Sequence, residues 1–554
     1  MKDEYDFIVV GAGSSGCALA NRLSADPKHR VLLVEAGPSD RNPFVRMPRG
    51  LGVLLVKGSK FIWTYKAKPT SELAPELWFK GRAIGGSSAI NGMVYMRGAP
   101  QDYDAWEAMG CEGWGWKHVV RKYVELEDHA LGASPSRGAG GPLKVSLHPA
   151  GDPLFDAIIR AGEQLGVPRV ADVNEPDAVR DGGIGYQPAN IHQGQRWSAS
   201  KAFLDPIRDR PNLDIVSDTQ VLALEFRGHR VVGIKVRQKS GTRSVRVRRE
   251  VILCAGAIES PKLLQLSGIG PASVLRAAGV AVVVDSPDVG RNLREHRHVD
   301  VKFRVKSHSQ NSELSGWRVV RSVLKYFTSK SGPMTHAAHE VGAFAKSEPG
   351  LDHADIQFGL MSVSTSSPAG SAKVELNPFP GVTFLGYFTR PTSQGELRIQ
   401  SSDPDAPLAI EANHLATEED RRKAIAVVRW LRALGSQPAL ADWIVEEISP
   451  GPRVQTDEEI LDKVFKLGGI CFHISGTARM GVDERSVVDP RLRVRGVEGL
   501  RVADTSVFPT MVSGNTNAPA MMLGLRAADF ILEDHAASGA RPHLAQDRRE
   551  SGEA

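Results

Sequence analysis

A glycine-rich turn near the N-terminus constrains the fold more than any other feature of the chain. Gly11, Gly13 and Gly16 follow the apolar run 7–10 and open a helical segment at 14–23. In a G-x-G-x-x-G turn, the first glycine makes the tight turn, the second lets a pyrophosphate approach the backbone, and the third lets helix and strand pack closely. The pattern predicts a strand–turn–helix unit with phosphates at the helix N-terminus, where free N–H groups and the helix dipole favour anions.

A second apolar run, residues 31–34, ends in Glu35. An acid at this distance from the glycine turn is placed to hold a ribose hydroxyl. A ribose 2′-phosphate would call for an arginine instead, so the two motifs together favour FAD or NAD over NADP.

Three separate parts of the chain read as α/β structure. Residues 6–35 form the first, and residues 497–532 read as a last strand at 500–503, a loop and a final helix. Between them, the block 212–270 shows short strands at 213–216, 221–226, 231–236 and 244–247, and then a strand at 250–255 that leads into a helix. One nucleotide-binding domain must therefore be assembled from distant segments.

Residues 301–464 are the candidate for a second domain. Strand-like pieces recur there at 301–305, 355–358, 382–388 and 396–400. Two helices follow, one after Thr417 and one after Thr456, each with the acidic first turn that is typical of a helix N-terminus. We expect an α/β fold class with two domains, followed by a flexible polar tail at 536–554.

The charge balance argues against a polyanionic partner. The 554 residues carry 69 Lys and Arg against 64 Asp and Glu, a formal net charge of +5. The densest basic run, which includes Arg243, Arg246 and Arg248, alternates with valines and indicates the solvent face of a strand. We expect no nucleic-acid partner.

Neither cysteines nor histidines indicate a metal site. The chain has four scattered cysteines without the spacing of a disulfide framework or a zinc site: Cys17, Cys111, Cys254 and Cys471. His296 and His298 have no further ligand nearby, and we interpret them as part of a loop at the domain junction. The expectation is that no metal is bound.

The apolar runs also bear on the compartment. The N-terminus enters an apolar strand at once, which leaves no room for a secretory segment. No uninterrupted apolar run reaches the ~18 residues needed to span a bilayer. We expect a cytoplasmic protein, while loose attachment to the inner face of a membrane and the oligomeric state stay open.

Four further motifs resemble the signatures of one family, the glucose–methanol–choline (GMC) oxidoreductases. The first two are GRAIGGSSAIN at 81–91 and GAIESPKLLQLSGIG at 256–270. The last two are HISGTARMG at 473–481 and SGNTNAP at 513–519. The resemblance runs from about residue 4 to 532, and it is strongest to bacterial FAD-dependent alcohol and choline dehydrogenases.

The resemblance implies two domains. A Rossmann-like FAD-binding domain would be discontinuous, comprising 1–155, 197–300 and 465–535. A substrate-binding domain, 156–196 and 301–464, would place an antiparallel sheet with flanking helices over the isoalloxazine ring.

The resemblance also implies the residues that contact FAD. The ADP half would be held by Gly11, Gly13, Gly16 and Glu35. The pyrophosphate and flavin would be lined by Arg82, Gly86, Ser87, Asn91, Gly92, Met93 and Val94. Val221 would meet the adenine and Asp504 would lie near the ribityl chain, and further contacts are expected from Ser15, Ala36, Trp63, Phe472, Ala503 and Thr516. Some family members tether the flavin through a histidine where this chain has Ile90, so FAD is expected to be bound without a covalent link.

The same comparison implies that His473 and Asn515 carry the catalysis. An alcohol gives up a hydride readily only as its O–H proton departs, so a base is needed beside flavin N5, and histidine suits near-neutral pH. Asn515 cannot take a proton, but its amide can orient the alcohol oxygen. Ile474 and Phe472 depart from the proline and the Tyr or Trp that are common beside the base, which weakens any inference about substrate shape.

The expected reaction is oxidation of an alcohol to an aldehyde or ketone, with electrons passed to a quinone or another carrier. Two alternatives stay open: an oxidase that passes electrons to oxygen and makes hydrogen peroxide, and a hydroxynitrile-type lyase that keeps FAD only structurally. Choline would need an aromatic cage or a carboxylate. Residues 301–464 contain large aromatic residues that could contribute to such a cage, among them Trp317, Tyr326, Tyr387 and Trp430, but we favour an uncharged primary alcohol.

Overall fold

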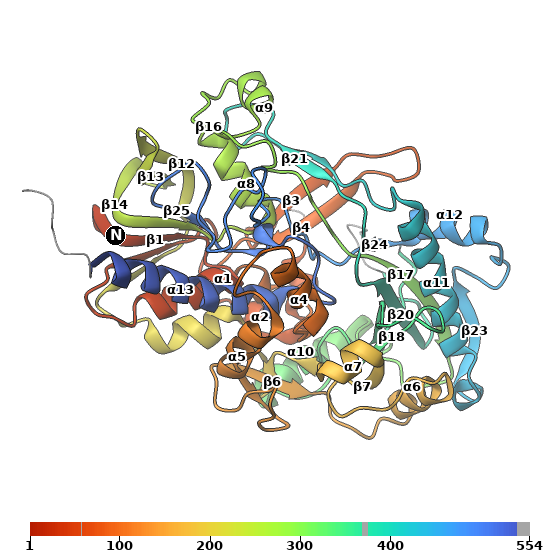
Figure 1. Cartoon of the computed structure of the whole chain (residues 1–554). Helices are drawn as coiled ribbons and strands as arrows, with labels where there is room; N and C mark the ends of the chain where they lie inside the picture. Colours follow the sequence, from red (N-terminus) through yellow and green to blue (C-terminus); the bar gives the residue numbers. More distant parts are fainter. Residues whose placement is uncertain (57, 368–374, 540–554) are drawn as a thin grey trace, which may run out of the picture.

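Two seven-stranded sheets organise the residues that the computed structural model describes, 1–56, 58–367 and 375–539 (Figure 1). The first has the order β11-β2-β1-β14-β13-β12, with β25 also paired to β14. Its parallel strands are β1 (Glu4–Val10), β2 (Val31–Val34), β11 (Leu213–Val216), β14 (Gly241–Leu253) and β25 (Leu500–Val502). The predicted convergence of three distant segments on one α/β sheet is thus confirmed.

The expected separate strands at 244–247 and 250–255 are wrong, because both belong to the single strand β14. Its first half pairs with β13 (Arg230–Gln238), which continues to β12 (Gln220–Arg227), and its buried second half lies between β1 and β25. Arg248 and Arg249 interrupt the apolar pattern, and the pairing with β1 shifts register at them, but strand β14 continues through both residues. Arg248 reaches the carboxylate of Asp6 on β1, so these arginines sit on a solvated edge.

Helices α1 (Ser14–Leu23) and α13 (Asn517–Gly539) lie side by side against this sheet (Figure 1). They approach so closely that a Cβ at Gly524 would lie 2.4 Å from the carbonyl oxygen of Ser15. The prediction that a flexible tail begins at residue 536 is wrong, because α13 continues to Gly539. The rest of that expected tail, 540–554, lies outside the described residues.

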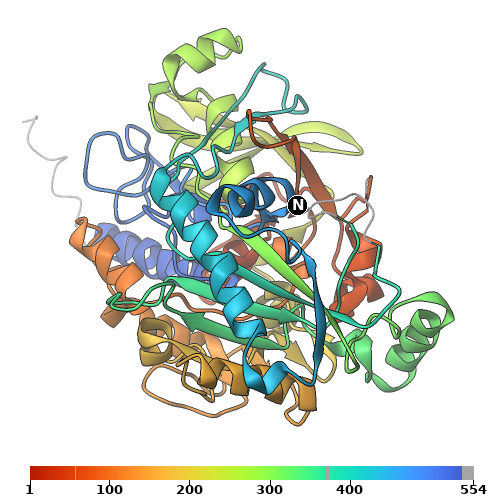
Figure 2. The same cartoon turned by 90° about the vertical axis from the view of Figure 1, so that its right-hand side faces the viewer.

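The second sheet is antiparallel throughout and has the order β23-β17-β20-β19-β18-β7, with β24 paired to β17. Its strands are β7 (Gly183–Tyr186), β17 (Arg297–Val305), β18 (Val341–Ala345), β19 (Ile356–Met361), β20 (Gly381–Phe388), β23 (Ile444–Ser449) and β24 (Gly469–Ile470). Helix α11 (Glu418–Gly435) lies diagonally across one face (Figure 2), where Gly386 makes room for Val427 and Leu431. The Rossmann-like domain with an attached antiparallel domain is therefore confirmed.

Both predicted helix starts are present. Thr417 accepts a hydrogen bond from the backbone N–H of Asp420 at the start of α11. Thr456 and Glu459 form a reciprocal capping box at the start of α12 (Asp457–Leu467).

The second domain differs from the expectation in several elements. Residues 396–398 form β21, which belongs to a separate sheet of β21, β22 (Ala409–Glu411), β3 (Ile62–Ala67) and β4 (Glu76–Gly81). Strands β18 and β23 were not foreseen. Three expected domain boundaries fall inside elements, namely α6 (Pro153–Gln164), β17 and α12.

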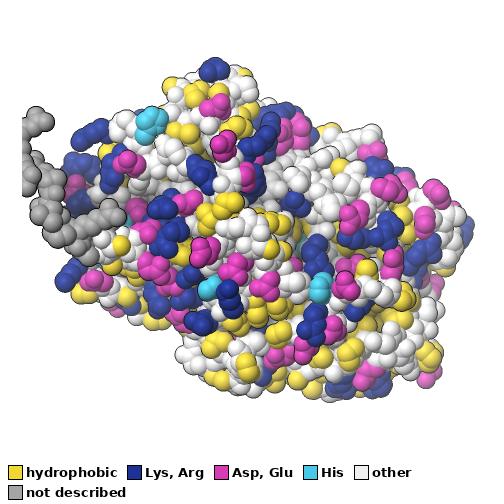
Figure 3. Space-filling model, in the orientation of Figure 1, with side chains coloured by type: hydrophobic (Ala, Val, Ile, Leu, Met, Phe, Trp, Pro, Cys, Tyr) yellow, Lys and Arg dark blue, Asp and Glu magenta, His cyan; other side chains and the backbone are white. Residues whose placement is uncertain are grey.

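The remaining elements form the connections. They are α2 (Pro43–Arg46), α3 (Leu51–Leu54), α4 (Pro100–Ala108), α5 (Trp116–Leu126), β5 (Glu127–His129), β6 (Leu143–Leu147), α7 (Pro176–Asp181), β8 (Pro188–Ala189), β9 (Ile191–His192), β10 (Gln195–Arg196), α8 (Gly256–Leu266), β15 (Ile269–Gly270), α9 (Ala272–Ala277), β16 (Val284–Asp285) and α10 (Gly316–Ser329). No helix within the described ranges has the length and apolar character needed to cross a bilayer. On the face shown in Figure 3, basic and acidic side chains are interspersed.

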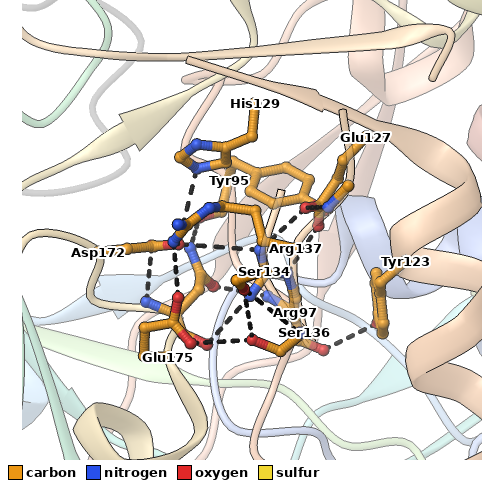
Figure 4. Close-up of polar contacts among 12 residues, drawn as sticks. Tyr95, Arg97, Tyr123, Glu127, His129, Ser134, Ser136, Arg137, Asp172 and Glu175 are labelled. Atoms are coloured by element: carbon orange, nitrogen blue, oxygen red, sulfur yellow. Dashed lines mark hydrogen bonds and ion pairs between the residues drawn. The ribbon is translucent and has the colours of Figure 1, made fainter. Parts of the chain in front are cut away.

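A buried ion network fixes the segment before α7 to β5 (Figure 4). The guanidinium of Arg97 donates to both oxygens of Glu127, at 2.6 and 2.9 Å, and both side chains are fully buried. Arg97 also donates to the carbonyl of Asn174, and Arg137 bridges the carboxylates of Asp172 and Glu175. These contacts hold the connection to the antiparallel sheet against the nucleotide-binding domain.

Candidate active site

A cavity of about 480 Å³ lies between the two large sheets. Its floor is formed where parallel strands end, at Val10 after β1, at Val34 after β2 and at Cys254 after β14. The opposite wall comes from the antiparallel sheet, including His298 of β17 and Tyr387 of β20. The carboxyl ends of parallel strands are the usual ligand site of an open α/β sheet.

Two glycine-rich loops meet at one end of this cavity. A Cβ at Gly86 would lie 2.6 Å from the Cα of Gly13, so only glycine allows this approach. At Gly13 itself, a Cβ would meet nothing nearer than 3.7 Å, because the position faces the cavity. Helix α1 starts there without a side-chain cap, which leaves its first N–H groups available to an anion.

Glu35 lies in the cavity wall at the end of β2, as the sequence predicts. Its carboxylate accepts hydrogen bonds from the backbone N–H groups of Ala12 and Gly37, at 3.0 and 2.8 Å. Burial raises the pKa of Glu35 to about 7. Asp504, after β25, similarly accepts from the N–H of Gly256 at 2.9 Å.

Most of the expected cofactor contacts line the cavity. They are Gly11, Gly13, Ser15, Glu35, Ala36, Trp63, Gly86, Ser87, Asn91, Gly92, Met93, Val94, Val221, Phe472, Asp504 and Thr516. Three do not line it. Gly16 packs against Gly11, so that a Cβ at Gly16 would lie 2.0 Å from the Gly11 carbonyl oxygen. The backbone N–H of Ala503 donates to the carbonyl of Leu253. The guanidinium of Arg82 lies over the ring of Trp63.

These features fit a flavin dinucleotide. The uncapped N-terminus of α1 and the paired glycines suit a pyrophosphate, and Glu35 suits a ribose hydroxyl. At the other end, the rings of Phe79 and Phe472 stack with centroids 6.4 Å apart and form an aromatic wall. FAD would therefore extend from the glycine loops towards His473.

His473 and Asn515 come together although they arise from different segments. His473 follows β24 and Asn515 precedes α13, and the Nε2 atom of His473 lies 3.0 Å from the Asn515 amide nitrogen. Phe472, the neighbour of His473, has a φ of 62°. This left-handed conformation costs a non-glycine residue roughly 1–2 kcal/mol, and such strain collects at functional sites.

A chain of hydrogen bonds orients Asn515. The Tyr387 hydroxyl donates to the side-chain oxygen of Gln357 at 2.5 Å. The Gln357 amide then donates to the Asn515 oxygen at 3.1 Å, so the NH₂ group of Asn515 faces His473. Nε2 of His473 must accept this hydrogen bond.

The other side of His473 requires the same tautomer. Its Nδ1 lies 3.0 Å from Nδ1 of His296, and Nε2 of His296 lies 2.7 Å from the carbonyl oxygen of Thr389. A carbonyl only accepts, so His296 carries its proton on Nε2 and accepts at Nδ1. His473 must then donate from Nδ1, and the lone pair on Nε2 accepts from the Asn515 amide at the cavity, which both residues line.

Burial keeps both imidazoles neutral. Desolvation, and then the proximity of His296, lowers the pKa of His473 well below its ordinary value. Desolvation also lowers the pKa of His296 to about 4. Glu295 accepts from the backbone N–H groups of both histidines at 2.8 Å and so holds the two segments together.

The interpretation of His296 and His298 as a junction loop is wrong for His298, which lies in β17 and lines the cavity. His296 lies in the segment directly before β17 and contacts His473. The alternation of polar and apolar residues from His298 to Val301 could have predicted that the strand includes His298. Lys80 and His339 were not predicted as site residues, and they line the cavity from β4 and from the segment before β18.

The Rossmann-like fold, the dinucleotide cavity and the His–Asn pair define a flavin-dependent oxidoreductase. The chain belongs to the GMC oxidoreductase family, since residues 5–298 match its N-terminal domain and residues 391–524 its C-terminal domain. The enzymes of this family use FAD and oxidise CH–OH groups, and this chain is one of them.

Relatives and solved structures agree with this assignment. An alcohol dehydrogenase [acceptor] of Pseudomonas putida is 38% identical over 95% of this chain and 96% of its own length. The mitochondrial choline dehydrogenase of Mus musculus is 39% identical over 96% of this chain and 90% of its own. The crystal structure of pyridoxine 4-oxidase from Mesorbium loti has 32% identity and a TM-score of 0.85, and the match covers 96% of this chain and 99% of that one.

Proposed function

We propose that this enzyme is a dehydrogenase that oxidises an uncharged primary alcohol to the aldehyde, with His473 as the base. The observation that carries the proposal is the tautomer of His473, because the Nε2 atom that lies beside the Asn515 amide at the cavity carries the lone pair. FAD, when bound, supplies the hydride acceptor.

The protein groups divide the work at the alcohol oxygen. Nε2 of His473 accepts the hydroxyl proton, and the Asn515 NH₂ group donates to the oxygen as its negative charge develops. Nδ1–H of His473 stays bonded to His296, which fixes the ring plane during the transfer. The mostly apolar surroundings exclude water that would compete for the base.

The cavity wall near His473 favours an uncharged substrate. Met361 and Leu385 line it together with Tyr387, and no carboxylate from the antiparallel sheet does so among the described residues. The three acids that line the cavity are Glu35, Glu259 and Asp504, which belong to the nucleotide-binding side, and each accepts hydrogen bonds from neighbouring groups.

An aromatic cage for a quaternary ammonium would need several rings at one place. Of the four candidate aromatics, Tyr387 lines the cavity, whereas Trp317 is exposed on α10 and Tyr326 and Trp430 pack in other clusters. Phe79 and Phe472 also line the cavity, but we assign their aromatic wall to the flavin, so we propose that choline, which is named for several relatives, is not the substrate.

We propose that a carrier such as a quinone accepts the electrons, because the chain is similar to an enzyme named alcohol dehydrogenase [acceptor]. The likeness to pyridoxine 4-oxidase and to formate oxidase supports oxygen as the second candidate. Ile90 lines the cavity with a side chain that cannot form a bond to a cofactor, so non-covalent FAD belongs to the proposal. A reducing compartment also belongs to it, because the four cysteines are unpaired.

The test is anaerobic mixing of the purified holoprotein with a panel of alcohols while flavin absorbance is followed. Bleaching by primary alcohols but not by choline is the expected result. If the flavin colour returns fast in air, the enzyme is an oxidase and not a dehydrogenase. If the colour returns slowly in air and a soluble quinone accelerates its return, the result supports the proposal. No bleaching by any alcohol would refute it, and hydroxynitrile cleavage with the flavin still oxidised would establish a lyase instead.

A further inference from the structure

Helix α10 (Gly316–Ser329) projects from the body of the protein with most of its surface in solvent (Figure 2). Ser322 and Tyr326 are its fully buried residues, and the Tyr326 hydroxyl bonds the carbonyl of Arg46. The helix is thus attached along one narrow side.

The exposed surface of α10 carries an apolar stripe. Trp317, Val320, Leu324 and Phe327 are 68%, 58%, 61% and 43% exposed. At roughly 100° per residue they fall within an arc of about 80°, on the side of the helix away from Ser322 and Tyr326. Large apolar side chains aligned in this way mark an interaction surface, whereas single exposed ones do not.

Basic residues border this stripe along one edge. Arg318, Arg321 and Lys325 are exposed on α10, Lys330 follows directly, and the helix contains no acidic residue. The Arg321 guanidinium lies 5.6 Å from the ring of Trp317, so charge and apolar surface are contiguous. An apolar face with tryptophan, leucine and phenylalanine beside a basic face is the pattern of helices that lie in a membrane interface.

We propose that α10 docks the enzyme on an anionic lipid bilayer, with the apolar stripe inserted below the headgroups and the basic residues against lipid phosphates. Charge complementarity selects this occupant. A second copy of the chain, docked stripe to stripe, would bring the arginines and lysines of both helices together. In an anionic bilayer, the acyl chains can contact the apolar stripe while the negatively charged headgroups contact the basic residues beside it.

The docking surface is linked to the active-site cavity through packing. Phe44 lies against Phe327 of α10, with ring centroids 6.3 Å apart. Phe44 also packs against the buried cluster around Val45 and Leu54, on which the cavity-lining Leu51 and Leu55 pack as well. Docking through α10 therefore places the α2–α3 side of the cavity near the membrane, where lipid-soluble alcohols and carriers are concentrated.

The experiment is co-sedimentation of the holoenzyme with vesicles of phosphatidylcholine alone or mixed with phosphatidylglycerol. We expect binding to the anionic vesicles that weakens as salt rises. The variant Trp317→Ser, Val320→Ser, Leu324→Ser should bind about tenfold more weakly. Arg318→Gln, Arg321→Gln, Lys325→Gln should remove the preference for anionic vesicles. Neither variant touches the cavity, so flavin content and activity with a soluble alcohol should stay at the wild-type level.

A matched control is Val445→Ser, Val482→Ser, which removes two exposed valines far from α10 in sequence and should leave vesicle binding unchanged. Wild-type enzyme that stays in the supernatant with anionic vesicles would overturn the proposal. It would also be overturned if the variant Trp317→Ser, Val320→Ser, Leu324→Ser bound anionic vesicles as tightly as the wild type. Light scattering measures the oligomeric state as a third arm. If the wild type is a dimer that does not bind vesicles, and the serine variant of the stripe is a monomer, then α10 is a self-association surface instead.

Discussion

The Nδ1 atoms of His473 and His296 lie 3.0 Å apart, and a single proton lies between them. The carbonyl of Thr389 fixes the proton of His296 on Nε2, so the shared proton belongs to His473. A residue that never contacts the alcohol thereby determines which nitrogen of the base is free to react.

Replacing His296 tests this relationship. His296→Leu removes the acceptor for Nδ1–H and frees the ring, and we expect flavin reduction by alcohol to slow by about 10²-fold with little change in KM. His296→Asn places an amide oxygen where Nδ1 was and should recover much of the rate. Anaerobic stopped-flow absorbance measures both, and equal rates in Leu and Asn variants would contradict a positioning role.

His473→Ala should retain FAD but slow flavin reduction by about 10²–10⁴-fold, the usual contribution of a general base. The retained flavin spectrum is the control, because it separates loss of the base from loss of the cofactor. Reduction at the wild-type rate would remove His473 from its role.

The pH dependence follows from the direction of the pKa shift. Burial holds the pKa of His473 well below its ordinary 6.5, so the base is already unprotonated at neutral pH. Protonation, and loss of activity, should occur only as the pH falls through the lowered pKa. We expect the rate of flavin reduction by a non-ionising alcohol to be flat above pH 6.5. A midpoint at or above 6.5 would show that the imidazole is solvated in the holoenzyme.

Two neighbouring glycines should separate cofactor binding from folding. Gly13 has a φ of −78° and free space for a Cβ on the cavity side, so Gly13→Ala should fold normally but lose FAD. Gly16→Ala would place its Cβ 2.0 Å from the carbonyl oxygen of Gly11 and should lower stability even without flavin. Flavin content and thermal unfolding of the apoproteins distinguish the two, and a Gly13→Ala variant with full flavin content would contradict the assigned pyrophosphate site.

The buried pair of Arg97 and Glu127 gives a prediction on stability. Arg97→Met leaves the Glu127 carboxylate buried without its cation and should destabilise the fold by about 3–5 kcal/mol. The comparison is Arg230→Met, which breaks an exposed contact with Glu498 and should leave the melting temperature unchanged. Thermal denaturation of both holoproteins checks this, and equal melting temperatures would show that the network does not brace the domain connection.

Local patterns were enough to predict the nucleotide-binding end of the site. The glycine turn at 11–16 and the acid at 35 act through backbone geometry within one strand–turn–helix unit, so their positions follow from spacing alone. His473 and Asn515 rest on the family resemblance, because 41 residues stand between them in the chain and neither segment indicates the other.

The contacts that could not be predicted all depend on tertiary pairing. His298 belongs to β17 and His296 directly precedes it, and the strands that pair with β17, namely β20, β23 and β24, begin 76 or more residues after its last residue. Gln357 and Tyr387 orient Asn515 only because β19 and β20 pair beside the cavity. Likewise β14 reads as two strands in the sequence, since its two halves have different neighbours and different exposure.

The close packing of α1 against α13 sets an order of events during synthesis. Ser14, in α1, bonds Asn517, which is translated 503 residues later. Helix α13 also supplies Ala520 to the cavity wall, so the nascent chain has no complete flavin site until α13 has been translated. Cofactor capture therefore waits for α13, and a message cut short before this helix yields a polypeptide that cannot become a flavoenzyme.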